Sequence, residues 1–225
     1  MYISRHMKTS PVTVTPETFL PDVRALMTNN KFRHLPVVDC GNRLVGMITD
    51  RDLRSAYPSS LLPEEKRTAI LAEVANTLVS SVMSTDVVFL TPLSTLDDAL
   101  HYFYRDKIGL LPVIDEEKRV IGVFSVQDLM KAYKKLYGIG DRGSALIAVV
   151  DDGNPKPLTR IVRVLEEQNV RFSRLTRAQN EAGDKNIIYL RVHTFNLSNV
   201  HRALKEIGMQ IVAPDVAGGA SERPL

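Results

Sequence analysis

Two stretches of this sequence place a hydroxyl three residues ahead of a carboxylate. Residues 46–53 read GMITDRDL and residues 122–129 read GVFSVQDL, so Thr49 precedes Asp52 and Ser125 precedes Asp128. One chemistry open to such a pair is helix capping, in which the hydroxyl accepts a hydrogen bond from an unpaired backbone N–H and the acid complements the helix dipole. The other is sugar binding, because a carboxylate at a cleft accepts hydrogen bonds from the hydroxyls of a ribose. The spacing alone is compatible with both.

Cations gather around the first stretch. Arg33 and His34 stand shortly before it, Arg51 lies inside it, and Lys8 lies near the start of the chain. The second stretch carries no cation at the matching positions, and Lys107 is the nearest to it. Clustered cations favour a phosphorylated ligand, although Arg51 and Lys8 are equally compatible with a solvated rim. The sequence does not decide which of two sites would take a phosphate.

The two stretches belong to a long internal repeat. Residues 7–54 align with residues 83–130 without a gap, and about a third of the paired positions are identical. A gapless match of this length indicates duplication. One unit of this size buries little core by itself, so we expect two copies to pack sheet against sheet and to form two related clefts.

Each copy predicts the order strand, helix, strand, strand, helix. Apolar residues at helical spacing predict the helices, and short apolar runs around turn residues predict a hairpin. The elements predicted in the first copy are a strand at 12–14, a helix from Leu20, strands at 35–38 and 44–48, and a helix from Thr49. In the second copy the first strand is predicted at 87–90, followed by a capping box at Ser94 and Asp97.

The duplicated unit resembles the CBS domain, and the pair resembles a Bateman module. The resemblance is carried by a Thr-Pro pair after the first strand, by RHLPVVD at 33–39 with GLLPVID at 109–115, and by the two hydroxyl–carboxylate stretches, and it covers residues 3–133. It implies that Thr49 with Asp52, and Ser125 with Asp128, contact the ribose of adenosine-containing ligands.

The same resemblance implies how the base would be held. The segments 9–12 and 85–88, which include Val12 and Val88, would flank the adenine, and the backbone near His34 and Leu110 would read its edge. The ligands implied are AMP, ADP, ATP or S-adenosylmethionine, with no metal required.

The last third of the chain has a different pattern. Strands and helices alternate there in the order βαββαβ, from a strand at 145–150 to a strand at 209–213, which is typical of a ferredoxin-like sandwich. This part resembles an ACT domain, a regulatory module that often binds amino acids at its first strand–helix loop. Lys156 stands about where the glycine of that family's loop would fall, so we expect association rather than amino-acid binding. The domain order resembles the acetoin-utilisation regulatory protein family.

The predicted fold class is therefore α+β, with tandem CBS domains followed by a ferredoxin-like, ACT-like domain. The predicted segments are CBS domain 1 at 1–56, a linker helix at 57–79, CBS domain 2 at 80–137, a hinge at 138–144, the ACT-like domain at 145–215 and a disordered tail at 216–225.

Composition narrows the classes of function. The net charge of +3 comes from scattered residues, which disfavours nucleic acid as a partner. No signal peptide or membrane span is predicted, Cys40 is the single cysteine, and we expect a cytoplasmic protein. The five histidines are dispersed and no catalytic set is evident, so we expect no enzyme.

We therefore expect a homodimeric, non-catalytic sensor of adenosine-containing ligands, related to energy sensing, which signals through its last domain to an unidentified protein target. The alternative is a scaffold protein whose nucleotide sites are vestigial.

Overall fold

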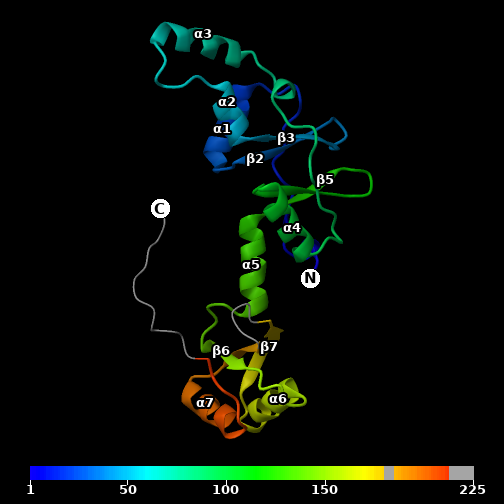
Figure 1. Ribbon diagram of the computed structural model, residues 1–225. Coiled ribbons are helices and arrows are strands. Elements are labelled where there is room, and N and C mark those ends of the chain that lie inside the picture. Colours follow the sequence, from blue (N-terminus) through cyan, green and yellow to red (C-terminus); the bar gives the residue numbers. More distant parts are fainter. Residues whose placement is uncertain (180–184, 213–225) are drawn as a thin grey trace. The chain divides into compact units, whose positions relative to one another are not determined.

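A computed structural model describes residues 1–179 and 185–212 of the chain. The chain divides into two compact units, of which the first is Met1–Ala132 and the second begins at Tyr133 (Figure 1). The boundary falls inside a helix, ahead of the hinge expected at 138–144. The predicted tail at 216–225 lies outside the described residues. No helix of the described residues is long and apolar enough to cross a membrane.

The first unit contains the repeat, and equivalent residues of the two copies pair in the same way in their hairpins. The hairpin of the first copy pairs His34 with Thr49, and that of the second pairs Leu110 with Ser125. Both hairpins have a register shift at the same place, and the two helices that precede them end in left-handed residues, Lys31 and Lys107. The elements of the first copy are α1 (Leu20–Asn30), β2 (His34–Val38), β3 (Leu44–Thr49) and α2 (Asp50–Ala56). Those of the second are α4 (Leu96–Asp106), β4 (Leu110–Ile114), β5 (Val120–Ser125) and α5 (Val126–Tyr137).

The strands predicted at 12–14 and 87–90 are not formed. Each is reduced to one parallel bridge, Val14 to Val37 and Leu90 to Val113. A Thr-Pro pair follows each bridge, and a proline has no N–H to extend a ladder. The predicted capping box at Ser94 is also displaced by one residue, because the Ser94 hydroxyl accepts a hydrogen bond from the backbone N–H of Thr91 instead.

The first segment of each copy pairs with the other copy. Strand β1 (Lys8–Thr9) lies antiparallel to β5, and Ser84 bridges Met47 of β3. Glycines permit this close approach, since a Cβ on Gly122 would lie 2.8 Å from the carbonyl oxygen of Lys8. The two copies are therefore interlocked by backbone pairing.

The turns of the two hairpins also meet. The backbone N–H of Leu44 donates to Lys118, and that of Val120 donates to Asn42. Between the copies lie α3 (Glu64–Ala75) and the short 3-10 helix η2 (Val79–Ser81), while η1 (Ile3–Arg5) precedes β1. Figure 1 shows α3 and the first copy in blue and cyan, and the second copy in green.

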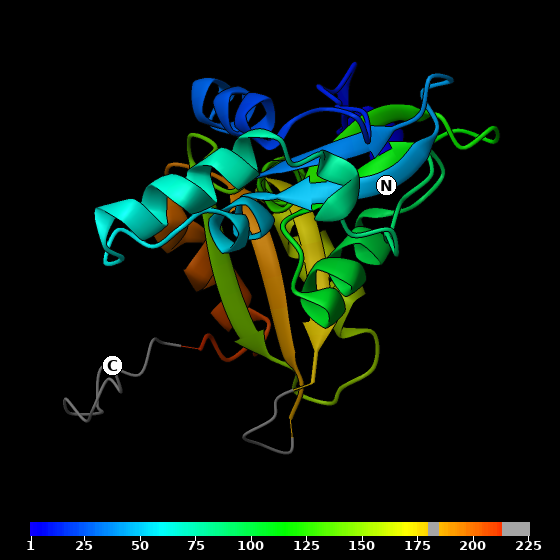
Figure 2. The same ribbon diagram turned by 90° about the horizontal axis from the view of Figure 1, so that it is seen from above.

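The second unit is a three-stranded antiparallel sheet in the order β6-β8-β7, which Figure 2 shows side by side. Its elements are β6 (Ser144–Val150), α6 (Pro157–Glu167), β7 (Arg171–Ala178), β8 (Ile187–His193) and α7 (Leu197–Glu206). Apolar residues of both helices pack on one face of this sheet, where Leu165 and Leu204 join Leu190 in one core.

This order agrees with the prediction as far as α7. The last predicted strand, 209–213, is represented only by a bridge from Ile211 to Val149, with Met209 buried in the core, and Ala213 lies outside the described residues. The structure is thus of the mixed α+β class.

Candidate ligand-binding cleft between the repeats

A cleft of about 370 Å³ opens between the two copies of the first unit. Its walls come from the start of β2, the end of β3 and the start of α2 in the first copy, and from the segment before α4 and the α4–β4 connection in the second. The lining residues are His34, Met47, Thr49, Asp50, Arg51, Ser84, Asp86, Val87, Val88, Asp106, Lys107, Ile108 and Leu110. This volume is within the range of small-molecule sites.

Five of the predicted site residues meet in this cleft: His34, Thr49, Arg51, Val88 and Leu110. They combine the Thr49 hydroxyl, Arg51 and the His34 ring of the first copy with the predicted base-flanking segment of the second. The crossing follows from the bridge between Met47 and Ser84, which brings the segment 84–88 against β3.

The other six predicted residues do not line this cleft: Lys8, Val12, Arg33, Asp52, Ser125 and Asp128. Lys8 pairs with Val123 of β5, so it accompanies the second hydroxyl–carboxylate stretch rather than Arg51. Arg33 is exposed, and its carbonyl oxygen accepts a hydrogen bond from the backbone N–H of Asp50.

Both stretches cap helices, which is one of the two roles that their spacing allows. Thr49 is the N-cap of α2: its hydroxyl accepts from the Asp52 N–H at 3.3 Å, while its own N–H and hydroxyl donate to Asp52 Oδ2 at 2.8 and 2.7 Å. Ser125 repeats these three contacts with Asp128, and the hydroxyl-to-carboxylate distance is 2.5 Å.

A third capping box shows what capping alone requires. Thr95 and Asp98 at the start of α4 form the same three hydrogen bonds, and Asp98 is exposed. In contrast, Asp52 is half-buried and Asp128 is only 6% exposed. No described residue donates to Oδ1 of Asp52 or of Asp128. Capping alone therefore does not require a buried carboxylate, and the burial of Asp52 and Asp128 needs a separate explanation.

Ion pairing leaves the cleft with uncompensated cations. Two of its carboxylates are engaged, Asp50 by Arg54 at 3.0 Å and Asp106 by Arg105 at 2.7 Å. Within residues 1–179 and 185–212, neither Arg51 nor Lys107 forms an ion pair. Asp86 is then the single lining carboxylate without an ion pair in that part of the chain. The balance favours an anionic group.

His34 lies at the junction of the two copies. A Cβ on Gly109 would be 3.1 Å from His34 Cε1, so the absence of a side chain at Gly109 leaves room for the ring. Burial lowers the pKa of His34 below its ordinary value of 6.5, against an opposing effect of Asp50. The ring is therefore mostly neutral at pH 7.

Lys107 was not among the predicted contacts of the Thr49 site, although its cationic character is visible in the sequence. It reaches this cleft because α4 ends there in a left-handed residue. Asp106 and Ile108 arrive through the same turn. Asp106, Lys107 and Ile108 lie near Thr49 rather than near Ser125 because of the pairing between the two copies. The sequence alone does not show this pairing.

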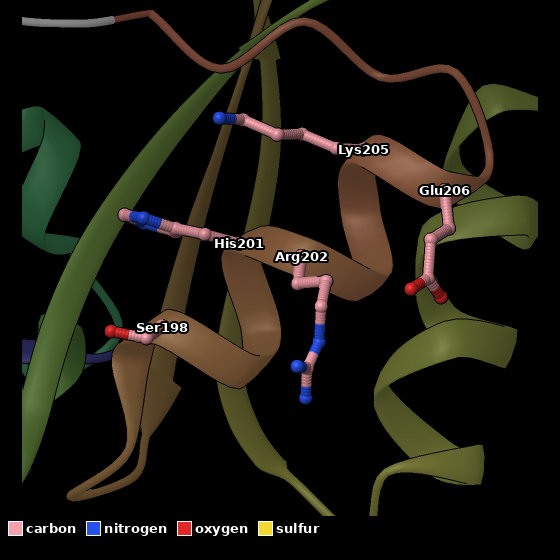
Figure 3. Close-up of a pocket in the computed structure, with 5 residues that line it drawn as sticks. All are labelled: Ser198, His201, Arg202, Lys205 and Glu206. Atoms are coloured by element: carbon pink, nitrogen blue, oxygen red, sulfur yellow. The ribbon is translucent and has the colours of Figure 1, made fainter.

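A basic surface of a different kind lies on α7 in the second unit. Ser198, His201, Arg202, Lys205 and Glu206 border a shallow depression there, and Figure 3 shows Glu206 directed away from His201 and Lys205. All five come from one helix, so they form a helix face rather than a cleft between elements. No group of three or more potential metal ligands occurs in the described residues.

Comparison with known proteins identifies the repeat. The CBS domain model matches residues 3–59 and 79–135, which together are half of the chain. An uncharacterized protein of Methanocaldococcus jannaschii is 33% identical over 132 residues, covering 59% of this chain and 45% of that protein. Inosine-5'-monophosphate dehydrogenase of Aquifex aeolicus is 32% identical over 126 residues, covering 56% of this chain and 23% of the enzyme. The chain thus spans less than half the length of these relatives.

Solved structures share this fold over 60% to 62% of the chain. A protein from Vibrio cholerae described in connection with acetoin utilization (AcuB) has a TM-score of 0.52 and 27% identity, covering 62% of this chain and 94% of its own. The protein CBSX2, solved in complex with AMP, has a TM-score of 0.51 and 22% identity, covering 60% of this chain and 96% of its own.

Proposed function

The chain belongs to the CBS-domain family, and on that premise we propose that it is a non-catalytic regulatory protein that binds an adenosine-containing ligand in the cleft lined by Thr49. The adenine lies against Val88 and the backbone near Leu110. The ribose lies at Thr49, where the free Oδ1 of Asp52 accepts a hydrogen bond from a sugar hydroxyl.

The observation that carries the proposal is the composition of the cleft, to which both copies contribute. It joins the Thr49 hydroxyl of one copy, which is hydrogen-bonded to Asp52 behind the lining, to an apolar segment from the other copy, and neither Arg51 nor Lys107 forms an ion pair within the described residues. A sugar, a planar base and a phosphate need those three kinds of partner. The AMP complex of CBSX2, a protein of the same fold, supports the same class of ligand.

We assign the phosphorylated ligand to this cleft. The counterpart cleft would be formed, by the offset between the copies, from Val12, Leu110 and the pair Ser125–Asp128. At the positions of Arg51 and His34 it has Gln127 and Leu110, so its cations would be Lys31 and Lys8. Both clefts thus have two cations, and what distinguishes the first is Arg51, whose guanidinium binds a phosphate through two parallel hydrogen bonds.

We further propose that the second unit is ACT-like and mediates association, as a homodimer or with a protein target. Ligand binding would bias the relative position of the two copies, and a ligand biases two states only by its differential affinity for them. The similarity to AcuB supports a bacterial type of regulator. We also propose that the protein is cytoplasmic and that its domains have the boundaries predicted from the sequence.

Calorimetric titration of the full chain with AMP, ADP, ATP, S-adenosylmethionine and adenosine tests the proposal. We expect AMP or another adenosine phosphate to bind in the micromolar range, about −8 kcal/mol. The bound nucleotide should be recovered unchanged, because no catalysis is proposed. Silence from all five ligands would favour the scaffold alternative, and turnover of the nucleotide would contradict a non-catalytic role.

A further inference from the structure

The second unit has a cavity of its own, at the end of the sheet where β6 begins. Strand β7 begins and β8 ends there too, because Ser144 and Arg171 both pair with His193. The cavity measures about 480 Å³. Its lining residues are Arg142, Gly143, Arg171, Phe172, Ser173, His193, Thr194 and Phe195. It lies at the opposite end of β6 from the loop at 151–156, where the first strand meets the first helix.

The charge lining this cavity is entirely positive. No lining residue carries a carboxylate, whereas Arg142 and Arg171 both contribute a guanidinium group. Neither arginine forms an ion pair with any described residue. Another arginine of the same sheet does have an acidic partner, since Arg177 Nε lies 2.6 Å from Asp151 Oδ2. An external carboxylate would supply the missing partner, and a guanidinium binds a carboxylate through two parallel hydrogen bonds.

Apolar rings border the same cavity. Phe195 is 86% exposed, which is unusual for a large aromatic side chain. Its ring rests on Gly143: a Cβ there would lie 3.3 Å from Phe195 Cζ, and the φ of +74° at Gly143 also favours glycine. Phe172 is 37% exposed. The rings offer an apolar surface next to the two cations.

Polar groups in the cavity are fixed rather than loose. His193 Nε2 and Ser173 Oγ are 3.1 Å apart, and the N–H of Thr194 donates to the carbonyl oxygen of Gly143 at 2.9 Å. These contacts hold the ends of β6, β7 and β8 together, so the side chains around them project from a rigid sheet end. A ligand that binds such a preorganised site pays a smaller entropic cost, because fewer groups must be ordered on binding.

We propose that this cavity binds a small organic anion, with its carboxylate on Arg142 and Arg171 and its apolar body against Phe195. The site shares no residue with the adenosyl cleft of the first unit. It makes the second unit a ligand-binding module in its own right and gives the protein two chemically different inputs.

Two-dimensional amide NMR of the full chain, titrated with sodium benzoate, tests the proposal. Benzoate should shift the amide signals of Gly143, Ser173 and Thr194 with a dissociation constant of about 1 mM. Its neutral analogue benzamide should not shift them. Arg171→Gln should weaken benzoate binding about tenfold, because one charge-assisted contact is lost. Arg163→Gln is the matched control, since Arg163 pairs with Glu167 on α6 outside the cavity, and it should bind like the wild type.

Four results would overturn the proposal. The first is no shift of these amides by benzoate up to about 10 mM. The second is an equal response to benzamide, which would show that the arginines do not bind the ligand through its negative charge. The third is unchanged benzoate affinity in Arg171→Gln. The fourth is an equal response to inorganic phosphate, which would show that the apolar body contributes nothing.

Discussion

At the scale of single residues, the question is what separates a sugar-binding carboxylate from a helix cap. Asp52, Asp98 and Asp128 all sit three residues after a capping hydroxyl and make the same hydrogen bonds. Asp98 differs in being exposed, whereas Asp52 is half-buried and Asp128 is buried. The chain therefore supplies an internal control for the capping role.

We expect Asp52→Ala to weaken AMP binding by about ten- to a hundredfold, the equivalent of one or two charge-assisted hydrogen bonds. Asp98→Ala should leave the affinity unchanged. Each variant should lose about 1–2 kcal/mol of unfolding free energy, because each loses a cap. Calorimetry and urea denaturation measure the two quantities. Equal AMP affinity in both variants would reduce Asp52 to a cap.

Lys107 gives a second test, directed at the phosphate. Lys107→Gln should weaken AMP binding about tenfold and leave adenosine binding unchanged, since only AMP carries the anion. Lys31→Gln is matched in conformation, because Lys31 ends α1 as Lys107 ends α4. A larger loss in Lys31→Gln, measured by the same titration, would move AMP to the counterpart cleft.

The lowered pKa of His34 links stability to pH. Below its ordinary value of 6.5 the unfolded chain takes up a proton before the folded one does, so stability is lost as the pH falls through that window. Between pH 7.5 and 5.5 the unfolding free energy of the wild type should fall more steeply than that of His34→Gln. Urea denaturation at several pH values measures the difference, and parallel pH profiles would contradict it.

At the scale of elements, the sequence predicted the repeat well and its pairing poorly. Apolar runs around Leu35 and Leu111 predicted both hairpins, and capping pairs predicted where α2 and α5 begin. The exchange of first segments between copies could not be predicted, because hydrophobic pattern reports which face of a strand is buried and not which strand lies beside it. For the same reason the cations near Thr49 were only partly identified.

The glycines at the exchanged pairing make it testable. Gly122→Ala should lower the unfolding free energy by about 1–3 kcal/mol, because the new Cβ would be 2.8 Å from the backbone oxygen of Lys8. Gly46→Ala should cost less, since the nearest atom there is the flexible Sδ of Met83 at 2.6 Å. Urea denaturation of both variants measures the order, and the reverse order would mean that β1 does not hold the copies together.

At the scale of the whole molecule, two units with different folds carry two different concave sites. The first is defined by duplication, which creates a cleft that neither copy possesses alone. The second is defined by the end of a sheet, where Arg142 and Arg171 lack acidic partners within the described residues. The sequence indicated the first through its repeated motif. It could not indicate the second, because Arg142, Arg171 and Phe195 are far apart in the chain and follow no spacing rule.

Hydrogen exchange of the full chain with and without AMP, followed by mass spectrometry, tests the central claim most directly. If the ligand occupies the cleft shared by both copies, AMP will slow exchange in three separate segments, 47–52, 84–88 and 106–110, and will leave the Thr95–Asp98 cap unchanged. Protection confined to one copy, or found only in the second unit, would contradict the account.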